Sequence, residues 1–265
     1  MSGQTPVKSH IIYPAPNPLS RMRLFCFCYA GGTAAIFRSW PRELPREIEV
    51  CAVQYPGRGS RMAEPLCDDI VALMNICYDE LQSLLDKPYA FFGHSMGALV
   101  SYEFARRLQR EGRVGPAQLF VSGCMAPDLK ITDEPTYNLP EPEFIAELRR
   151  LQGTPAGVLD NSELMQLMMP ILRADFKASQ TYEYVAGPPL QCPISAFGGL
   201  NDEMVTREKV EGWSRHTQSD CRVKMLPGDH FFLNSSQSLL TGIIARELTA
   251  LLAAGFRSTA GLGHD

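Results

Sequence analysis

The feature of the sequence that most constrains the fold is a tight turn between a buried strand and a helix. The apolar run at residues 88–92 predicts a strand, and residues 98–109 have the apolar spacing of a helix. Between them, from Gly93 to Gly97, the chain reads GHSMG. Two glycines allow a sharp turn and a close approach of the helix to neighbouring strands. Such a turn holds the hydroxyl of Ser95 above the end of the strand.

Short apolar runs alternate with helical patterns along the rest of the chain. Strands are expected at 23–28, 49–54, 89–92, 118–122, 194–197 and 222–226, and helices at 34–44, 68–85, 98–109, 205–217 and 235–253. Strands buried on both faces read as continuous apolar runs, so the pattern predicts a mostly parallel central sheet with helices on both faces. Together with a Gly-x-Ser-x-Gly turn, this indicates an α/β-hydrolase fold, in which the turn is the nucleophile elbow.

One long interval interrupts the alternation. About seventy residues separate the strand that ends near Gly123 from the strand that starts at Ile194, and a single crossover helix needs far less chain. A loop rich in Pro, Asp and Thr at 126–142 precedes helical patterns at 143–151 and 163–184. We therefore expect a helical lid at about 126–190, inserted into a single α/β-hydrolase domain that spans 1–255. The small, polar tail at 256–265 is expected to be disordered.

Three methionines lie on the expected lid, at Met165, Met168 and Met169. Methionine is flexible and fills irregular apolar space. These side chains therefore either pack the lid onto the body or line an adaptable pocket for an acyl chain, and the sequence leaves both possibilities open.

Composition narrows the possible function classes. The chain has 265 residues, 20% of them charged, and a net charge of −4. This balance, without a run of basic residues, argues against binding to nucleic acid or to a membrane surface. The first twenty residues lack the apolar core of a signal peptide, so we expect a cytoplasmic protein and, by default, a monomer.

Eight cysteines are present, but no Cys-x-x-Cys pair occurs. Without a secretion signal, we expect reduced thiols that act as small apolar side chains, and no metal site made by these cysteines. Four cysteines lie in strongly apolar segments and are expected to be buried: Cys26, Cys28, Cys51 and Cys124.

A serine hydroxyl is a weak nucleophile and needs a base, which a third group must orient. Among the five histidines, His230 follows the strand at 222–226 through a short loop, where ligand chemistry occurs in open α/β sheets. His94 lies within the elbow and is expected to be structural, whereas His216 ends a helical pattern and is expected to be a surface residue. His230 is therefore the predicted base.

Two carboxylates remain possible as the orienting acid. Asp202 follows the strand at 194–197, and Asp128 follows the strand at 118–122. Loops after neighbouring parallel strands converge at one edge of a sheet, so both positions are workable. Asp202 is preferred, and Asp128 is kept as the alternative.

The oxyanion of an acyl-transfer reaction needs two backbone N–H donors. One is expected from Met96, the residue after the nucleophile. The other is expected from Ala30, in a turn with two glycines that leads into a helix after the first strand.

At this point the sequence resembles the type II thioesterases, the stand-alone editing enzymes of polyketide and nonribosomal peptide synthetases. The resemblance spans about residues 22–250 and rests on four segments. They read FCYAGG at 27–32, QYPGRGSR at 54–61, GHSMGA at 93–98, and FGGLND at 197–202 paired with GDHFF at 228–232. The second segment is the most specific, because many hydrolases share the elbow. The family pattern places the triad on Ser95, Asp202 and His230.

The resemblance implies hydrolysis of acyl thioesters on the phosphopantetheine arm of an acyl- or peptidyl-carrier protein, through an acyl-serine intermediate. It also implies that no metal or dissociable cofactor is required. Carrier proteins are typically acidic, so Arg58 and Arg61 in the second segment could contribute to a basic docking patch. Internal ion pairs that rigidify this loop are the preferred role for both arginines. A general carboxylesterase or lipase is the competing enzyme class, and a non-catalytic fold that binds a carrier protein is the competing non-enzyme class.

Overall fold

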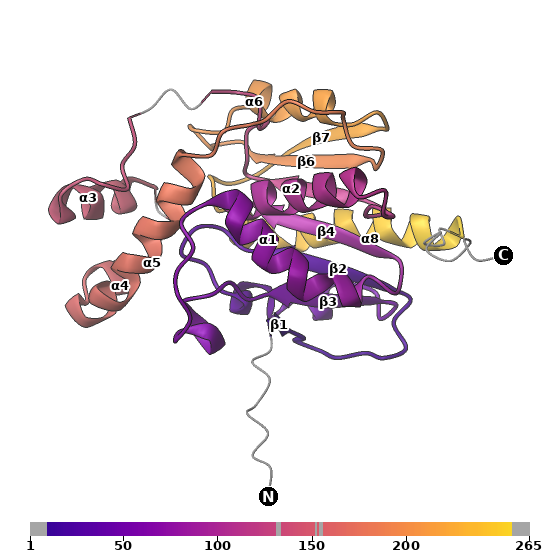
Figure 1. Cartoon of the computed structure of the whole chain (residues 1–265), viewed down its shortest axis with the longest axis horizontal. Helices are drawn as coiled ribbons and strands as arrows, with labels where there is room; N and C mark the ends of the chain where they lie inside the picture. Colours follow the sequence, from indigo (N-terminus) through magenta and orange to yellow (C-terminus); the bar gives the residue numbers. More distant parts are fainter. Residues whose placement is uncertain (1–9, 131–133, 152, 154–155, 256–265) are drawn as a thin grey trace, which may run out of the picture.

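A computed structural model of the chain describes residues 10–130, 134–151, 153 and 156–255. Its centre is a seven-stranded sheet in the order β1-β3-β2-β4-β5-β6-β7 (Figure 1). β1 is antiparallel to β3, and every other neighbouring pair is parallel. The strands are β1 (Ile11–Ile12), β2 (Met22–Phe27), β3 (Ile48–Val53), β4 (Tyr89–His94), β5 (Leu119–Ser122), β6 (Ile194–Gly199) and β7 (Cys221–Leu226).

Burial explains why these segments form strands. Every residue of β3, β4, β5 and β6 is buried, as expected of strands that are covered on both faces. The prediction of a mostly parallel sheet is confirmed, with each of the six expected strands present. β1 was not predicted, because two residues leave too short a pattern to recognise.

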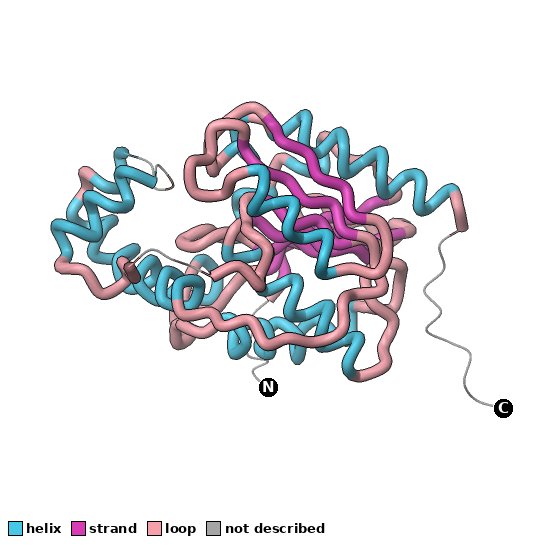
Figure 2. Tube along the Cα trace, turned by 90° about the horizontal axis from the view of Figure 1, so that it is seen from above, coloured by secondary structure: helices cyan, strands magenta, loops and turns pink. Residues whose placement is uncertain are grey.

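Helices cover both faces of the sheet. α1 and α2 lie side by side on one face, and α8 lies on the opposite face (Figures 1 and 2). The helices of the body are α1 (Ile70–Leu81), α2 (Met96–Arg110), α6 (Arg207–Glu211), α7 (Phe232–Ser235) and α8 (Gln237–Ala253). None of the helices in the described ranges is both long and apolar enough to cross a bilayer.

The prediction of one helix at 34–44 is wrong. The chain instead forms two short 3-10 helices there, η1 (Ala34–Phe37) and η2 (Trp40–Arg42). Pro41 lies in the first turn of the second helix, where its missing N–H is tolerated, but the same residue prevents one continuous α-helix.

The long interval between β5 and β6 contains three helices, α3 (Glu141–Leu151), α4 (Ala156–Leu159) and α5 (Ser162–Gln180). They lie together beyond one edge of the body, at the left of Figure 1. These helices have a small apolar cluster of their own, whose buried members are Phe144, Leu148, Leu159, Met165 and Leu172. These helices occupy the interval in which a lid insertion is expected, and we call α3, α4 and α5 the lid. The expected tail at 256–265 lies outside the described residues.

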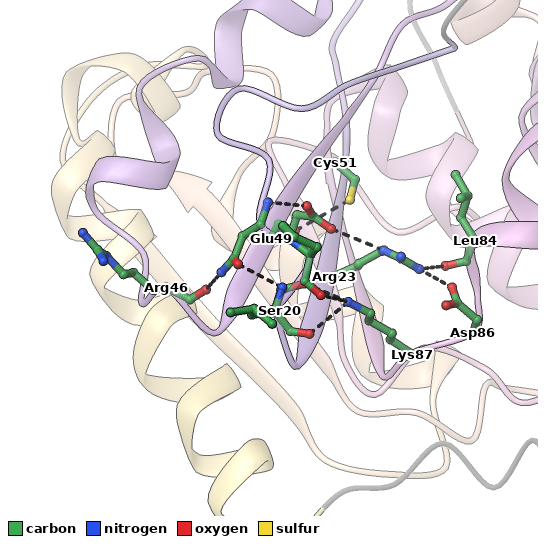
Figure 3. A network of polar contacts seen from close by, with 11 residues as sticks. Ser20, Arg23, Arg46, Glu49, Cys51, Leu84, Asp86 and Lys87 are labelled. Carbon is green, nitrogen blue, oxygen red and sulfur yellow. Dashed lines mark hydrogen bonds and ion pairs between the residues drawn. The ribbon is translucent and has the colours of Figure 1, made fainter.

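A polar network joins the amino ends of three strands on the far side from the elbow (Figure 3). The Glu49 carboxylate accepts a hydrogen bond from the amide of Asn17 at 2.8 Å and pairs with Arg23 at 3.4 Å. Arg23 also pairs with Asp86, and the ammonium of Lys87 donates to the carbonyl oxygen of Ser20 at 3.1 Å. These contacts fix the loops that enter β2, β3 and β4.

Candidate active site

Ser95 lies between the end of β4 and the first residue of α2, in a backbone conformation that residues other than glycine rarely adopt. Its φ is 53° and its ψ is −117°, and such strain is typical of functional turns. Its amide donates to the carbonyl oxygen of Ser122 at 2.8 Å. A Cβ atom on Gly93 would lie 2.2 Å from the Gly97 carbonyl oxygen, and one on Gly97 would lie 2.2 Å from that of Phe27. Both glycines are therefore sterically required.

The structure brings Ser95, His230 and Asp202 together from three separate loops. His230 Nε2 lies 3.1 Å from Ser95 Oγ, and His230 Nδ1 lies 2.7 Å from Asp202 Oδ2. The imidazole thus connects the serine hydroxyl to a buried carboxylate. This arrangement matches that of a nucleophile, its base and an orienting acid.

Asp202 is held as a carboxylate by its surroundings. Its side chain is buried, which alone would raise its pKa, but the hydrogen bond and charge of His230 lower the pKa to below the usual 3.8. The amides of Met204 and Val205 both donate to Asp202 Oδ1 at 3.0 Å and lower the pKa further. These donors also fix the direction in which the second oxygen faces His230.

The alternative acid, Asp128, has other partners. Its carboxylate pairs with Arg215 at 2.8 Å and lies 2.8 Å from His216 Nε2. In this structure Asp202, and not Asp128, is the carboxylate beside His230.

The expectation that His216 is a surface residue is wrong. Its side chain is buried, and its Nδ1 lies 2.9 Å from the hydroxyl of Tyr102. The rings of Trp213 and Tyr184 pack edge-on against the imidazole. Burial lowers the pKa of His216, although the bond to Asp128 opposes this change. Three of the partners, Tyr102, Asp128 and Tyr184, come from distant segments, so the local helical pattern carries no signal of this burial.

A cavity of about 420 Å³ lies beside Ser95 and His230. Its apolar wall comes from both the body and the lid, and includes Leu99, Met125, Leu148, Leu172, Phe176 and Val205. Ala30 and Met96, the two expected oxyanion donors, line the same cavity as Ser95. Met96 is the first residue of α2, where helix amides carry partial positive charge. The cavity could hold an acyl chain with its carbonyl carbon near Ser95.

The three lid methionines lie elsewhere. Met165 is buried in the apolar cluster of the lid, and Met168 and Met169 pack against that cluster. They are not among the described residues that line the cavity. The methionines therefore hold the lid helices to one another, and other lid residues, among them Leu172 and Phe176, form the wall of the cavity.

Residues 22–251 match the family model for the thioesterase domain. The matched stretch is most of the chain and includes all three residues of the Ser-His-Asp arrangement. The chain belongs to the thioesterase family. It is therefore a hydrolase, and a thioesterase as the sequence predicts.

Curated relatives of this thioesterase include proteins of peptide and polyketide biosynthesis. It is 44% identical over 237 residues to the gramicidin S biosynthesis protein GrsT of Aneurinibacillus migulanus, covering 89% of this chain and 93% of that protein. It is 39% identical over 229 residues to the thioesterase PikA5 of Streptomyces venezuelae, covering 84% and 78%.

Solved structures agree with this assignment. The type II thioesterase BorB from the borrelidin biosynthetic cluster superposes with a TM-score of 0.83 at 38% identity, covering 90% of this chain and 97% of that one. Human thioesterase 2, at 24% identity and a TM-score of 0.65, shares the fold.

Both arginines of the QYPGRGSR segment of the thioesterase are paired internally. Arg61 pairs with Glu64 and with Glu80, the latter at 2.9 Å. Arg58 pairs with Asp175 of α5, and both arginine side chains are only 2% exposed. Internal pairing is confirmed for both, so neither belongs to a basic patch on the surface. Asp175 itself was missed, because it lies 117 residues from Arg58 and no sequence pattern links the two.

The cysteines of the thioesterase are all free. The four expected to be buried are buried, and burial raises the pKa of the Cys28 and Cys124 thiols to about 12. Such thiols stay protonated at neutral pH and are poor nucleophiles. Within the ranges that the structure describes, no group of His, Cys, Asp and Glu is arranged to hold a metal ion.

Proposed function

We propose that this thioesterase hydrolyses acyl thioesters on the phosphopantetheine arm of an acyl- or peptidyl-carrier protein, through an acyl-Ser95 intermediate. The observation that carries the proposal is the hydrogen-bonded series from Asp202 through His230 to Ser95 at the wall of an apolar cavity. The names of the relatives, which refer to gramicidin S and borrelidin biosynthesis, support a role in a synthetase pathway.

In the first half of the reaction, Ser95 Oγ attacks the thioester carbonyl carbon while His230 Nε2 accepts the hydroxyl proton. Asp202 stabilises the imidazolium through its bond to Nδ1. The amides of Met96 and Ala30 donate to the oxyanion of the tetrahedral intermediate. When this intermediate collapses, the carbon–sulfur bond breaks, the pantetheine thiol leaves with the proton from His230, and the acyl group remains on Ser95.

In the second half, His230 takes a proton from a water molecule, which attacks the acyl-serine carbonyl. Collapse of the second tetrahedral intermediate breaks the ester bond to Ser95 Oγ, which regains its proton from His230. The free carboxylic acid then leaves. The protein groups end in their starting protonation states, so the cycle is closed by water alone.

The setting of this reaction follows from the same proposal. A carrier protein delivers its acyl group on a long flexible arm, so the enzyme needs a route from its surface to the cavity rather than a deep docking groove. We propose that the enzyme acts as a cytoplasmic monomer on such carriers. The three-helix lid beside the cavity would determine which acyl chains fit.

A paired-substrate assay tests the substrate class. Hydrolysis of an acyl-carrier thioester is compared with hydrolysis of a simple ester that bears the same acyl group. We expect kcat/KM for the carrier thioester to be higher by at least about tenfold, since carrier contacts add binding energy that the ester lacks. A clear preference for the ester would instead identify a general carboxylesterase.

Replacing the nucleophile tests the mechanism. Ser95→Ala should lower kcat by a factor of about 10⁴ or more, because the covalent route is lost. Mass spectrometry should detect an acyl-enzyme in the unmodified protein and none in the variant, while carrier binding is kept. Turnover near that of the unmodified protein would exclude Ser95 as the nucleophile.

A further inference from the structure

One buried carboxylate joins three segments that are far apart in the chain. Asp175 lies in the carboxyl-terminal half of α5 and is 0% exposed. Its two oxygens contact Arg58, in the loop after β3, and Gly31, in the loop after β2. A single lid residue therefore contacts both the arginine of the most specific sequence segment and the turn that carries the expected oxyanion donor.

The contact with Arg58 is a two-pronged ion pair inside the protein. Arg58 Nη2 donates to Asp175 Oδ1 at 2.7 Å, and Nη1 donates to Oδ2. The guanidinium also lies over the ring of Tyr55, 5.6 Å from its centroid. Planar bidentate pairs of this kind fix geometry as well as charge. The position of the Asp175 carboxylate is thus set by the body of the protein, through Arg58.

The contact with Gly31 fixes the backbone of the turn. The amide of Gly31 donates to Asp175 Oδ2 at 2.6 Å. Gly31 has a φ of +77°, and a Cβ atom there would lie 2.6 Å from Cδ2 of Leu172, also on α5. The lid helix therefore packs directly on the backbone of this turn, at a left-handed position where a side chain would be strained.

These bonds determine where the Ala30 amide points. The peptide before Ala30 is held because the Tyr29 carbonyl accepts from the Gly32 amide at 2.9 Å. The peptide after Ala30 is held by the bond from Gly31 to Asp175. The Ala30 N–H belongs to the planar peptide unit before Ala30, in which it is trans to the Tyr29 carbonyl. That carbonyl accepts from Gly32, and the position of Gly32 follows from Gly31, whose own amide is bound by Asp175. The direction of the Ala30 N–H thus depends on Asp175.

We propose that Arg58 and Asp175 are positioning residues that hold the Ala30 N–H toward the oxyanion, so that the oxyanion site is complete only while α5 is docked on the body. This inference rests on the proposed function, because it assigns the Ala30 amide to that reaction. Neither residue touches the substrate. Leu172 and Phe176, on the turns of α5 beside Asp175, line the cavity. One helix therefore both contacts the acyl chain and orients a group that acts on its carbonyl.

Arg58→Lys tests the inference, with Arg61→Lys as the matched control. Both arginines lie in one loop and are 2% exposed. The side chain of Arg61 contacts Glu64, Glu80 and the Gln54 carbonyl oxygen, and not Asp175 or Gly31. Lysine keeps the charge and loses the bidentate contact. The measurements are kcat and KM for an acyl-carrier thioester, the melting temperature, and the Ki of a trifluoromethyl ketone with the same acyl chain. That ketone adds Ser95 Oγ to its carbonyl carbon and places its oxygen in the oxyanion site.

We expect Arg58→Lys to lower kcat by about tenfold or more and to raise Ki by a similar factor, with KM changed by less than about threefold. Arg61→Lys should lower the melting temperature but change kcat and Ki by less than about threefold. If Arg58→Lys changes only the melting temperature, or if both variants lose kcat equally, the inference is wrong.

Asp175→Asn provides a second route if Arg58→Lys does not fold. It keeps the volume and one oxygen acceptor, so it cannot serve both partners fully, and the same criteria for kcat and Ki apply. The unmodified enzyme in the same assay separates the two proposals. If it does not hydrolyse the carrier thioester, the proposed function fails; if it does and the variants keep their kcat and Ki, only the positioning role fails.

Discussion

At the scale of single residues, His94 shows how the elbow protects its base from a competing charge. The imidazole of His94 is 0% exposed, and its ring centroid lies 5.4 Å from that of His230. Burial holds the pKa of His94 well below 6.5, and the nearby His230 lowers it further. A neutral His94 adds no repulsion when His230 takes the proton of Ser95. The ring instead packs against its neighbours and lies 2.9 Å from Ser122 Oγ through Nδ1.

The lowered pKa of His94 predicts weaker stability in acid. Below pH 6.5 the unfolded chain binds a proton at this histidine and the folded chain does not. As the pH is lowered below 6.5, the free energy of unfolding therefore decreases by up to about 1.4 kcal/mol per pH unit. Urea unfolding at pH 7.5, 6.5 and 5.5 measures the slope. His94→Gln should reduce it between pH 6.5 and 5.5, and His10→Gln, at a less buried site, should reduce it less. A slope equal to that of the unmodified protein would contradict this account.

A pair of carboxylate substitutions tests which acid orients the base. Asp202→Asn should lower kcat about 10³–10⁴-fold, because the amide no longer holds the imidazole in the required tautomer. Asp128→Asn should change kcat by less than about threefold, because Asp128 pairs with Arg215 and His216. Steady-state kinetics on one thioester substrate measures both. If Asp128→Asn lowered kcat more than Asp202→Asn, the orienting acid would instead be Asp128, after β5.

At the scale of elements, α5 contributes the same side chains to the apolar cluster of the lid and to the cavity. Leu172 belongs to the apolar cluster of the lid and also lines the cavity, and Phe176 packs against that cluster and lines the cavity as well. The ring of Phe176 also packs edge-on against Phe144 of α3, with centroids 5.3 Å apart. The size of the side chain at position 176 thus limits the space for an acyl chain.

Shortening that side chain should change chain-length preference. Phe176→Ala should raise kcat/KM for an acyl chain longer by two methylenes, relative to the shorter chain, by about tenfold, since each buried methylene contributes about 0.8 kcal/mol. Met168→Ala, within the lid cluster, should leave this ratio unchanged. Competition between two acyl-carrier thioesters in one tube measures the ratio directly. Equal shifts in both variants would mean that lid stability, and not cavity size, controls selectivity.

Elements also show where the sequence was sufficient for prediction. The six long strands and the order of Ser95, Asp202 and His230 could be predicted, because each depends on local patterns and on the rule that loops after parallel strands converge. The burial of His216 could not, since it depends on Tyr102 and Asp128 from other segments. The partner of Arg58 was equally hidden, because ion pairs across a fold leave no periodic signal.

At the scale of the whole molecule, the active site and a stabilising polar network lie at opposite ends of the strands of the sheet. The elbow and its partners lie at the carboxyl ends of the strands, and the network around Glu49 lies at the amino ends (Figure 3). The loops at the carboxyl ends of the strands and those at the amino ends have no residues in common. Substitutions at the amino ends should therefore lower activity only by unfolding the whole sheet.

Glu49→Gln tests this separation. Loss of the charge that pairs with Arg23 and accepts from Asn17 should lower the free energy of unfolding by about 1–3 kcal/mol. The kcat of the folded fraction should stay within about twofold of normal. Glu47→Gln, on an exposed side chain nearby, should change stability by less than about 0.5 kcal/mol. Denaturant titration and turnover on the same samples measure both, and a parallel loss of kcat would refute the separation.

The burial of Asp175 limits how lids can be exchanged between relatives. A transplanted lid without a carboxylate at this position would leave the Arg58 cation enclosed with no partner, at a cost of about 3–5 kcal/mol. Chimaeras designed for new acyl chains should therefore move α5 together with its body-side contact, or replace Arg58 at the same time. For protein engineering, this lid is not an interchangeable module, because its Asp175 side chain neutralises a buried arginine of the body.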